Sequence, residues 1–274
     1  MNLSSTTMDS GKRLRLERLA HRRGGGLFLV PLDHSVADGP VASSDDLAHI
    51  VDAVGRNGAD GVVVHKGRVR FLSSALLRDL ALVVHLSAST SHAPDADHKV
   101  LVADVEQALR HGADAVSVHV NLGSDTEAQQ LADLGRVADG CALWGIPLLA
   151  MIYPRGPRIP DDSDPALVAH AASLAADLGA DIVKTPYTGA VDTMADVVRS
   201  CPIPVVTAGG DKADSEAKLY ASIEDVMCSG AAGVAVGRNV FQAPDVARVT
   251  RRIAEIVHNH PCGSTTVPRQ TATA

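Results

Sequence analysis

The sequence predicts an α/β protein that folds as a single closed (β/α)8 barrel. The chain has 274 residues, which is within the range of one large barrel domain. A phrase that begins with glycine and runs into a short β-branched stretch recurs four times along the chain. Together with four further apolar runs and the amphipathic segments between them, it gives eight alternating strand–helix units. An open doubly wound sheet is the alternative arrangement of such units.

The recurring phrase predicts four of the eight strands. It reads NGADGVVVHKG at 57–67, HGADAVSVHVN at 111–121, LGADIVKTPYTG at 178–189 and SGAAGVAVGRN at 229–239. The glycine suits the end of a helix, where a positive φ is needed. The apolar run after it suits a parallel strand that is covered on both faces.

Four other apolar runs supply the remaining strands, and helical patterns lie between them. These strands are expected at 26–35, 81–90, 146–156 and 203–212. Amphipathic helices are expected at, for example, 45–56, 164–179 and 215–230.

The barrel is expected to occupy residues 25–260, without an internal linker. Residues 1–24 are expected to form a flexible segment with a contact helix, GKRLRLERLA, and residues 261–274 a disordered tail.

Composition and charge exclude several classes of protein. Hydrophobic residues make up 46% of the chain and charged residues 21%, which allows a sizeable core. A net charge of −7 argues against a general nucleic-acid binder, because phosphate backbones need clustered cations. No run approaches the roughly 20 apolar residues that span a bilayer. The four cysteines are far apart and form no CxxC pair, so we expect a soluble protein of the reducing cytoplasm.

Polar side chains follow the predicted strands at the points where they end. In barrels of this kind the chemistry lies at the carboxyl ends of the strands. The candidates in chain order are Asp33 and His34, His65 and Lys66, His85 and Ser87, His119 and Asn121, Tyr153 and Arg155, Lys184, Gly209–Gly210, and Gly237–Arg238.

Lys184, in ADIVKTPYTG, is the first candidate for catalysis. Loss of hydration beside apolar neighbours favours a neutral amine, which can attack a ketone to form a Schiff base. A salt bridge to a carboxylate is the alternative role.

Tyr153, at the end of the neighbouring strand, favours catalysis because a phenol can move protons next to an imine. A tyrosine that serves only in packing is the alternative. Asp33, in PLDHSVADGP, is a third ionisable group, for which an N-cap or a salt bridge is the alternative.

The last two predicted strands end in glycines, in TAGGDK and AVGRNVFQ. Backbone N–H groups of Gly209, Gly210 and Gly237 can point at an anion, and the short helix that follows adds its positive end. Arg238 can hold a phosphate with two parallel hydrogen bonds. Glycine turns without a ligand are the alternative, but their presence on both strands favours a phosphate site.

Three histidines give the strongest rival signal. His65, His85 and His119 end three successive predicted strands, and converging imidazoles can bind zinc. Their spacing is not diagnostic, since barrel histidines also serve as hydrogen-bond donors to substrate. We therefore expect no metal, and we keep a zinc-dependent lyase as the alternative.

The motifs VPLDHSVADGP, HLSASTSHAPD, YPRG, DIVKTPYTG and AVGRNVFQ follow one another over almost all of residues 25–242. Together they resemble the archaeal-type class I aldolases, the DeoC/FbaB-like barrel group. The resemblance implies that Lys184 is the Schiff-base lysine, that Tyr153 donates and accepts protons, and that Asp33 is an acid–base or orienting group. It also implies a phosphate cradle, made by Ala208, Gly209, Gly210, Gly237 and Arg238.

The resemblance carries further expectations about ligands and assembly. His34, His119 and Arg155 are expected to contact substrate. The covalent imine at Lys184 replaces a cofactor, and relatives commonly form rings of five subunits or pairs of rings. Relatives usually read Asp-His-Gly where this chain has Asp33-His34-Ser35, and His92 is unusual for the family. Both differences bear on which aldehyde or ketone fits.

The resemblance is strongest to family members that make seven-carbon amino keto acids. The expected reaction joins dihydroxyacetone phosphate to L-aspartate 4-semialdehyde, as a step toward 3-amino-4-hydroxybenzoate. A dideoxyheptulosonate synthase and a class I fructose-bisphosphate aldolase are the alternatives within the family. For a bisphosphate, the second phosphate clamp could come from Arg155, Lys66 and Arg68. A non-catalytic phosphosugar sensor is the alternative outside catalysis.

Overall fold

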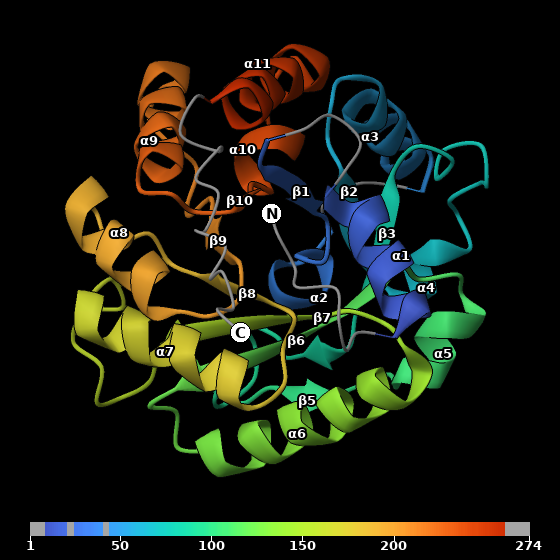
Figure 1. Cartoon of the computed structure of the whole chain (residues 1–274). Helices are drawn as coiled ribbons and strands as arrows, with labels where there is room; N and C mark the ends of the chain where they lie inside the picture. The colour runs from blue at the N-terminus through green and yellow to red at the C-terminus, as the bar shows by residue number, and fades with distance from the viewer. Residues whose placement is uncertain (1–8, 21–24, 41–43, 261–274) are drawn as a thin grey trace, which may run out of the picture.

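Eight parallel strands close into a barrel in the computed structural model, which describes residues 9–20, 25–40 and 44–260 (Figure 1). Around the barrel the strands follow the order β1-β10-β9-β8-β7-β6-β3-β2. Their bounds are β1 Leu27–Pro31, β2 Gly61–His65, β3 Ala81–His85, β6 Ala115–Leu122, β7 Leu148–Pro154, β8 Ile182–Thr185, β9 Val205–Ala208 and β10 Gly233–Ala235. The predicted closed barrel is confirmed, and the open sheet is excluded.

Helices surround the strands, as Figure 1 shows along the barrel axis. Their bounds are α1 Ser10–Ala20, α2 Ser35–Asp38, α3 Ser44–Arg56, α4 Lys66–Val69, α5 Val105–Arg110, α6 Glu127–Trp144, α7 Pro165–Asp177, α8 Val191–Ser200, α9 Glu216–Cys228, α10 Arg238–Phe241 and α11 Val246–Asn259. Side-chain caps begin two of the predicted helices. Asp164 accepts the N–H groups of Ala166 and Leu167, and Ser215 accepts that of Lys218.

One predicted strand, 81–90, is divided in the structure. β3 ends at His85, and Ser87–Ala88 forms a separate short strand, β4. It pairs antiparallel with β5, Val100–Leu101, outside the barrel sheet. The apolar run is continuous in sequence, so only this long-range pairing reveals the break.

The strand side chains alternate between an outer and an inner layer. On β2, for example, Val62 and Val64 belong to the layer under the helices, whereas Val63 belongs to the cluster that fills the barrel. The alternation follows from the two-residue period of a strand. It also determines which residues face the mouth of the barrel, because each inner-layer residue is followed two positions later by another on the same side.

Helix α1 covers the end of the barrel at which the strands begin. Leu16 and Leu19 are fully buried in the same cluster as the inner-layer residues. Lys12 forms an ion pair with Asp181 at 3.0 Å, and Arg18 forms one with Asp114 at 3.1 Å. The predicted contact helix therefore packs on its own barrel. Residues 1–8 and the predicted tail at 261–274 lie outside the described residues.

The recurring Gly-Ala-Asp phrase has a structural role at this same end. Its glycines, Gly58, Gly112, Gly179 and Gly230, have positive φ, as predicted. In three of the four copies an aspartate follows and accepts an N–H from the first or second residue of a neighbouring strand. The pairs are Phe28 N to Asp60 at 2.7 Å, Leu82 N to Asp114 at 2.9 Å and Leu148 N to Asp181 at 2.8 Å.

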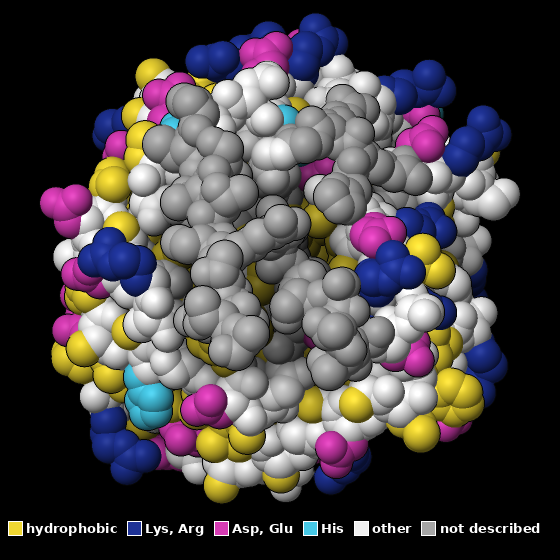
Figure 2. Space-filling model, in the orientation of Figure 1, with side chains coloured by type: hydrophobic (Ala, Val, Ile, Leu, Met, Phe, Trp, Pro, Cys, Tyr) yellow, Lys and Arg dark blue, Asp and Glu magenta, His cyan; other side chains and the backbone are white. Residues whose placement is uncertain are grey.

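The visible surface carries charges of both signs. In Figure 2, Lys and Arg side chains are interspersed with Asp and Glu around the rim of this face. None of the described helices is long and apolar enough to span a bilayer.

Candidate active site

A cavity of about 670 Å³ opens at the carboxyl ends of the strands. It is lined by all the residues expected to act in catalysis, phosphate binding or substrate contact: Asp33, His34, His119, Tyr153, Arg155, Lys184, Ala208, Gly209, Gly210, Gly237 and Arg238. The two-residue period of a strand explains why these side chains meet in the cavity. Lys184 lies two positions beyond Ile182, and Tyr153 two positions beyond Met151, both of which are inner-layer residues.

Lys184 is buried in the wall of this cavity. Its side chain comes from β8 and is 8% exposed. Within the described part of the chain, its Nζ takes part in no hydrogen bond or ion pair, so the salt bridge considered as an alternative is not present. The centroid of the Tyr153 ring is 5.8 Å from Nζ. An amine in this setting is poorly hydrated and free to meet a ligand.

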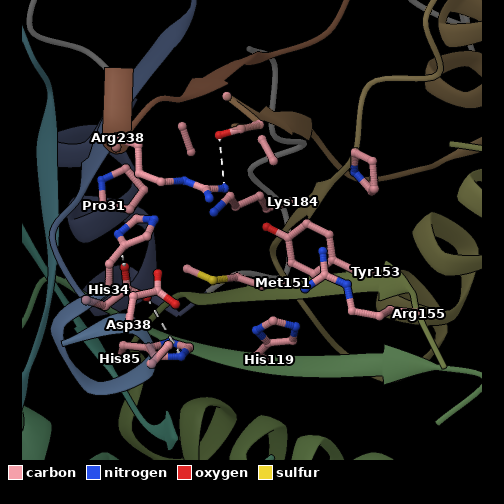
Figure 3. A pocket seen from close by; sticks show the side chains of 18 of the residues that line it. Pro31, His34, Asp38, His85, His119, Met151, Tyr153, Arg155, Lys184 and Arg238 are labelled. Atoms are coloured by element: carbon pink, nitrogen blue, oxygen red, sulfur yellow. Dashed lines mark hydrogen bonds and ion pairs between the residues drawn. The ribbon is translucent and has the colours of Figure 1, made fainter. Parts of the chain in front are cut away.

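Tyr153 stands at the centre of the polar group. In Figure 3 its hydroxyl points toward the side chain of Lys184. The ring of His119 lies 4.9 Å from its ring centroid, and the Arg155 guanidinium lies 5.6 Å from it. These contacts hold the phenol in place from other sides, which leaves its hydroxyl available for proton transfer.

Asp33 lies close to two histidines beyond the end of β1. Its carboxylate is 3.9 Å from Nε2 of His85 and 3.6 Å from Nδ1 of His34. Burial alone would raise its pKa, but the positive charges of His85, His34 and Lys184 outweigh burial and lower it. The other nitrogen of His85, Nδ1, is 2.8 Å from the Ser117 hydroxyl. The arrangement keeps Asp33 ionised and fixes one imidazole beside it.

The three histidines of the zinc alternative do not converge on one point. The rings of His65 and His85 stand edge to face with centroids 5.2 Å apart. His119 instead holds the Asn121 amide oxygen at 2.8 Å. Among the described residues, no group of three or more His, Cys, Asp or Glu side chains is placed to hold a metal ion. Burial lowers the pKa of His85 to about 4 and also lowers the pKa values of His65 and His119, so all three are neutral near pH 7.

The glycine loops after β9 and β10 form the opposite side of the cavity. Gly210 has a φ of +63°, a left-handed conformation that favours glycine. A side chain at Gly237 would meet the carbonyl oxygen of Pro31 at 2.7 Å. Asn239 fixes this region, because its amide donates to the carbonyls of Gly209 and Asp211. The predicted cradle segments are therefore adjacent in space.

Arg238 is engaged by protein atoms in this arrangement. One terminal nitrogen is 2.6 Å from the carboxylate of Asp211, and the other donates to the Gly210 carbonyl at 3.2 Å. The Asp211 side chain is 88% exposed, so this ion pair is weak and replaceable. Figure 3 places Arg238 and Arg155 on opposite sides of the cavity, with Lys184 and Tyr153 between them.

Sequence reasoning missed one cation of the site and misplaced two others. Lys99 lines the cavity, although it follows no barrel strand. Lys66 and Arg68, suggested as a second phosphate clamp, line a separate hollow beside α4, and Lys66 donates to Gln107 there. Lys99 is placed in the cavity by the β4–β5 pairing, which could not be predicted from the sequence.

Comparison with known proteins agrees with this geometry. The model of the DeoC/LacD family aldolases matches residues 27–243. The chain belongs to this family. It is therefore an aldolase, a carbon–carbon lyase, built on a (β/α)8 barrel.

Two curated relatives match almost the whole of this aldolase. The 2-amino-4,5-dihydroxy-6-oxo-7-(phosphonooxy)heptanoate synthase of Streptomyces griseus is 51% identical over 248 residues, which cover 90% of each chain. The 2-amino-3,7-dideoxy-D-threo-hept-6-ulosonate synthase 1 of Archaeoglobus fulgidus is 44% identical over 252 residues, or 91% and 92% of the two chains.

A solved structure supplies a chemical parallel. An archaeal fructose-1,6-bisphosphate aldolase, solved with its catalytic lysine covalently bound to the carbinolamine intermediate of its substrate, superposes with a TM-score of 0.82. It is 29% identical to this chain, and the match covers 90% of this chain and 99% of the other.

Proposed function

We propose that this aldolase joins dihydroxyacetone phosphate to L-aspartate 4-semialdehyde through a Schiff base on Lys184. The product is 2-amino-4,5-dihydroxy-6-oxo-7-(phosphonooxy)heptanoate, the compound in the name of the Streptomyces griseus relative. The observation that carries the proposal is the buried Lys184 beside the Tyr153 hydroxyl, without an ion pair to any described residue, in a cavity with an arginine on each side.

The reaction begins with attack of the Lys184 amine nitrogen on the ketone carbon. The carbinolamine loses water and gives a protonated imine, which withdraws electrons from the neighbouring carbon. Removal of a proton from the carbon that bears the free hydroxyl gives an enamine. That carbon then bonds to the aldehyde carbon, and the aldehyde oxygen takes up a proton. Hydrolysis of the new imine releases the product and restores Lys184.

Tyr153 and Asp33 are assigned the proton transfers and the stabilisation of charge in this reaction. Tyr153 has its hydroxyl directed at the lysine, so it is suited to move protons at the imine and at the neighbouring carbon. Asp33 stays ionised near pH 7 because its pKa is lowered: the charges that His85, His34 and Lys184 carry when protonated outweigh the opposing effect of burial. Its negative charge stabilises the protonated imine on the opposite side of the site.

The phosphate of the donor is assigned to the glycine loops after β9 and β10. The N–H groups of Gly210 and Gly237 have no protein acceptor within the described part of the chain, so they can bind an anion. Arg238 joins them when the phosphate replaces the exposed carboxylate of Asp211. His34 lies against Gly237 and Phe241, and so limits the space near the first strand.

A reaction with purified enzyme tests the proposal. Dihydroxyacetone phosphate and L-aspartate 4-semialdehyde are supplied together and separately, and products are identified by mass spectrometry. We expect a phosphorylated seven-carbon amino keto acid from the wild type with both substrates, and none from Lys184→Ala. No product from this pair, together with a six-carbon bisphosphate when D-glyceraldehyde 3-phosphate replaces the semialdehyde, would support the fructose-bisphosphate alternative. No product with either aldehyde would support the dideoxyheptulosonate alternative, whose methyl ketone requires a donor other than dihydroxyacetone phosphate.

Two features of this enzyme in the cell remain predictions. We expect it to act in the cytoplasm and to assemble as a homo-oligomer of five or ten subunits. Light scattering coupled to size-exclusion chromatography measures the assembly directly, since a 28.4 kDa monomer is easily distinguished from such rings.

A further inference from the structure

We propose that the Arg155 side of the cavity binds the carboxylate of the acceptor aldehyde, and that Lys99 and Arg155 are the residues that hold it. This inference rests on the proposed function, in which the donor phosphate occupies the opposite, Arg238 side. It assigns a role to Lys99, which belongs to no motif at the end of a barrel strand, and it identifies the carboxylate as the group by which the acceptor aldehyde is selected.

The β4–β5 pairing brings Lys99 into the cavity. Ala88 is the register partner of Val100, so Lys99, which precedes Val100, lies next to Ser89. Its Nζ donates to the Ser89 hydroxyl at 2.5 Å and to the carbonyl of Ala96 at 2.9 Å. These two contacts hold the ammonium in place, and an ammonium has a third donor.

Lys99 carries a charge that the protein does not neutralise directly. Within the described part of the chain, no carboxylate forms an ion pair with it. Burial lowers the pKa of Lys99, and the positive charge of Arg155 lowers it further, against the smaller opposing effects of Asp97, Asp38 and Asp95. The charge of Lys99 in turn contributes to the lowered pKa of His119, after the larger effect of burial. Two cations thus face the same space, and an anion between them would relieve their repulsion.

Arg155 is the second member of this group and is only loosely held. Its guanidinium lies over the ring of Tyr153, and its ion pair with Asp162 is 3.8 Å long, with both side chains about half exposed. Such a pair contributes little and can exchange for a ligand. Because Tyr153 contacts both Arg155 and Lys184, an aldehyde that reacts beside Lys184 can direct its far end toward Arg155.

The charges around this group favour a carboxylate over a second phosphate. Asp162 and Asp38 line the same cavity, and the loop that carries Lys99 contacts the helix of Asp38, because Ser91 N donates to the Ala37 carbonyl at 3.0 Å. Two carboxylates would repel a dianionic phosphate. An amino acid head group suits both signs of charge, since its carboxylate meets the cations while its ammonium meets the acids.

The test compares three aldehydes in Lys99→Met and in a control, Lys66→Met. Lys66 is partly buried and hydrogen-bonded, but it lies outside the cavity. For Lys99→Met we expect the KM for L-aspartate 4-semialdehyde to rise about tenfold to a hundredfold, the loss that follows when a charge-assisted hydrogen bond is removed. Succinic semialdehyde, which keeps the carboxylate but lacks the amine, should lose as much. Butanal, which lacks both groups, should react as with the wild type.

Borohydride trapping of dihydroxyacetone phosphate separates the possible failures. If Lys99→Met still forms the reduced adduct and retains wild-type KM values for both carboxylated aldehydes, the carboxylate subsite is wrong while the proposed function stands. D-glyceraldehyde 3-phosphate is supplied as a fourth aldehyde; if the variant loses activity only with it, Lys99 binds a phosphate and the assignment is overturned. If the wild type forms no adduct, the proposed function itself fails. A similar KM increase in Lys66→Met would mean a general charge effect and would also overturn the assignment.

Discussion

The two ends of the barrel use charged residues in opposite ways. At the end where the strands begin, Asp114 accepts a backbone N–H and pairs with Arg18, and Asp181 does the same with Lys12. At the end where the strands finish, Lys184 has no such partner among the described residues, and Asp33 is 3.9 Å from His85. Charges that are paired and hydrogen-bonded stabilise a fold, whereas buried charges left without partners cost stability and are suited to ligands. The charged residues at the start of the strands therefore stabilise the fold, whereas those at the end of the strands are available to bind and react with a ligand.

The largest expected effect comes from Lys184→Met. Removing the nucleophile should lower kcat at least about a thousandfold, because no other described amine lies beside Tyr153 in the same position. The melting temperature should stay the same or rise, since the variant removes a buried polar amine that makes no hydrogen bond or ion pair with the described residues. Calorimetry and steady-state kinetics together check this. A large fall in melting temperature would show that Lys184 also holds the fold.

Tyr153→Phe should have the next largest effect. Loss of the phenol should lower kcat about a hundredfold to ten-thousandfold, the usual range for one acid–base group. The phenylalanine ring keeps the packing against His119, so the fold should be unaffected. Trapping with borohydride should still yield an adduct, because Lys184 remains. Wild-type kcat in this variant would mean that another group moves the protons.

The histidines of the mouth should make stability depend on pH. The pKa of His85 falls from the usual 6.5 to about 4 through burial. The unfolded chain then binds more protons than the native one between these values, so stability present above pH 6.5 is lost as the pH falls toward 4. One such group contributes about 3 kcal/mol over this window. Asp33, with a lowered pKa, contributes a further loss only below its usual 3.8.

Urea denaturation at several pH values, with His85→Gln for comparison, measures this effect. The variant should lose less stability between pH 6.5 and 4 than the wild type does. Equal slopes for the two proteins would contradict the assignment of a buried neutral imidazole at this position.

The smallest expected effect comes from Asp114→Ala at the opposite end. It leaves the N–H of Leu82 without its acceptor and Arg18 without its partner, so unfolding should become easier by about 1–3 kcal/mol. The kcat of the folded enzyme should not change. Asp125→Ala, at an exposed position, is the matched control and should alter neither quantity. A fall in kcat for Asp114→Ala would mean that the two ends are not independent.

Much of the fold and of the site could be predicted because both depend on local pattern. Glycine before a β-branched run marks each of four strands. Alternation along the strands then predicts that Lys184 and Tyr153 lie on the same side as the inner-layer residues that precede them by two positions. The role of the aspartate in the same phrase could not be predicted from local pattern, since its partners lie on other strands and on α1.

The remainder required distances between segments that are remote in sequence. Lys99 enters the cavity only through the β4–β5 pairing, and Lys66 is excluded from it only by the direction in which β2 continues into α4. The zinc alternative also could not be judged from spacing, because the orientations of His65, His85 and His119 are set by burial and by neighbours such as Asn121.

The most direct test of the division between the two ends is to locate the borohydride adduct. Wild-type enzyme is reduced in the presence of dihydroxyacetone phosphate, digested and mapped by mass spectrometry. We expect modification of Lys184 alone, because it lies beside Tyr153 and forms no hydrogen bond or ion pair with the described residues, whereas Lys12 at the other end is held by its pairing with Asp181. An adduct on Lys99 or Lys12, with Lys184 unmodified, would contradict this expectation.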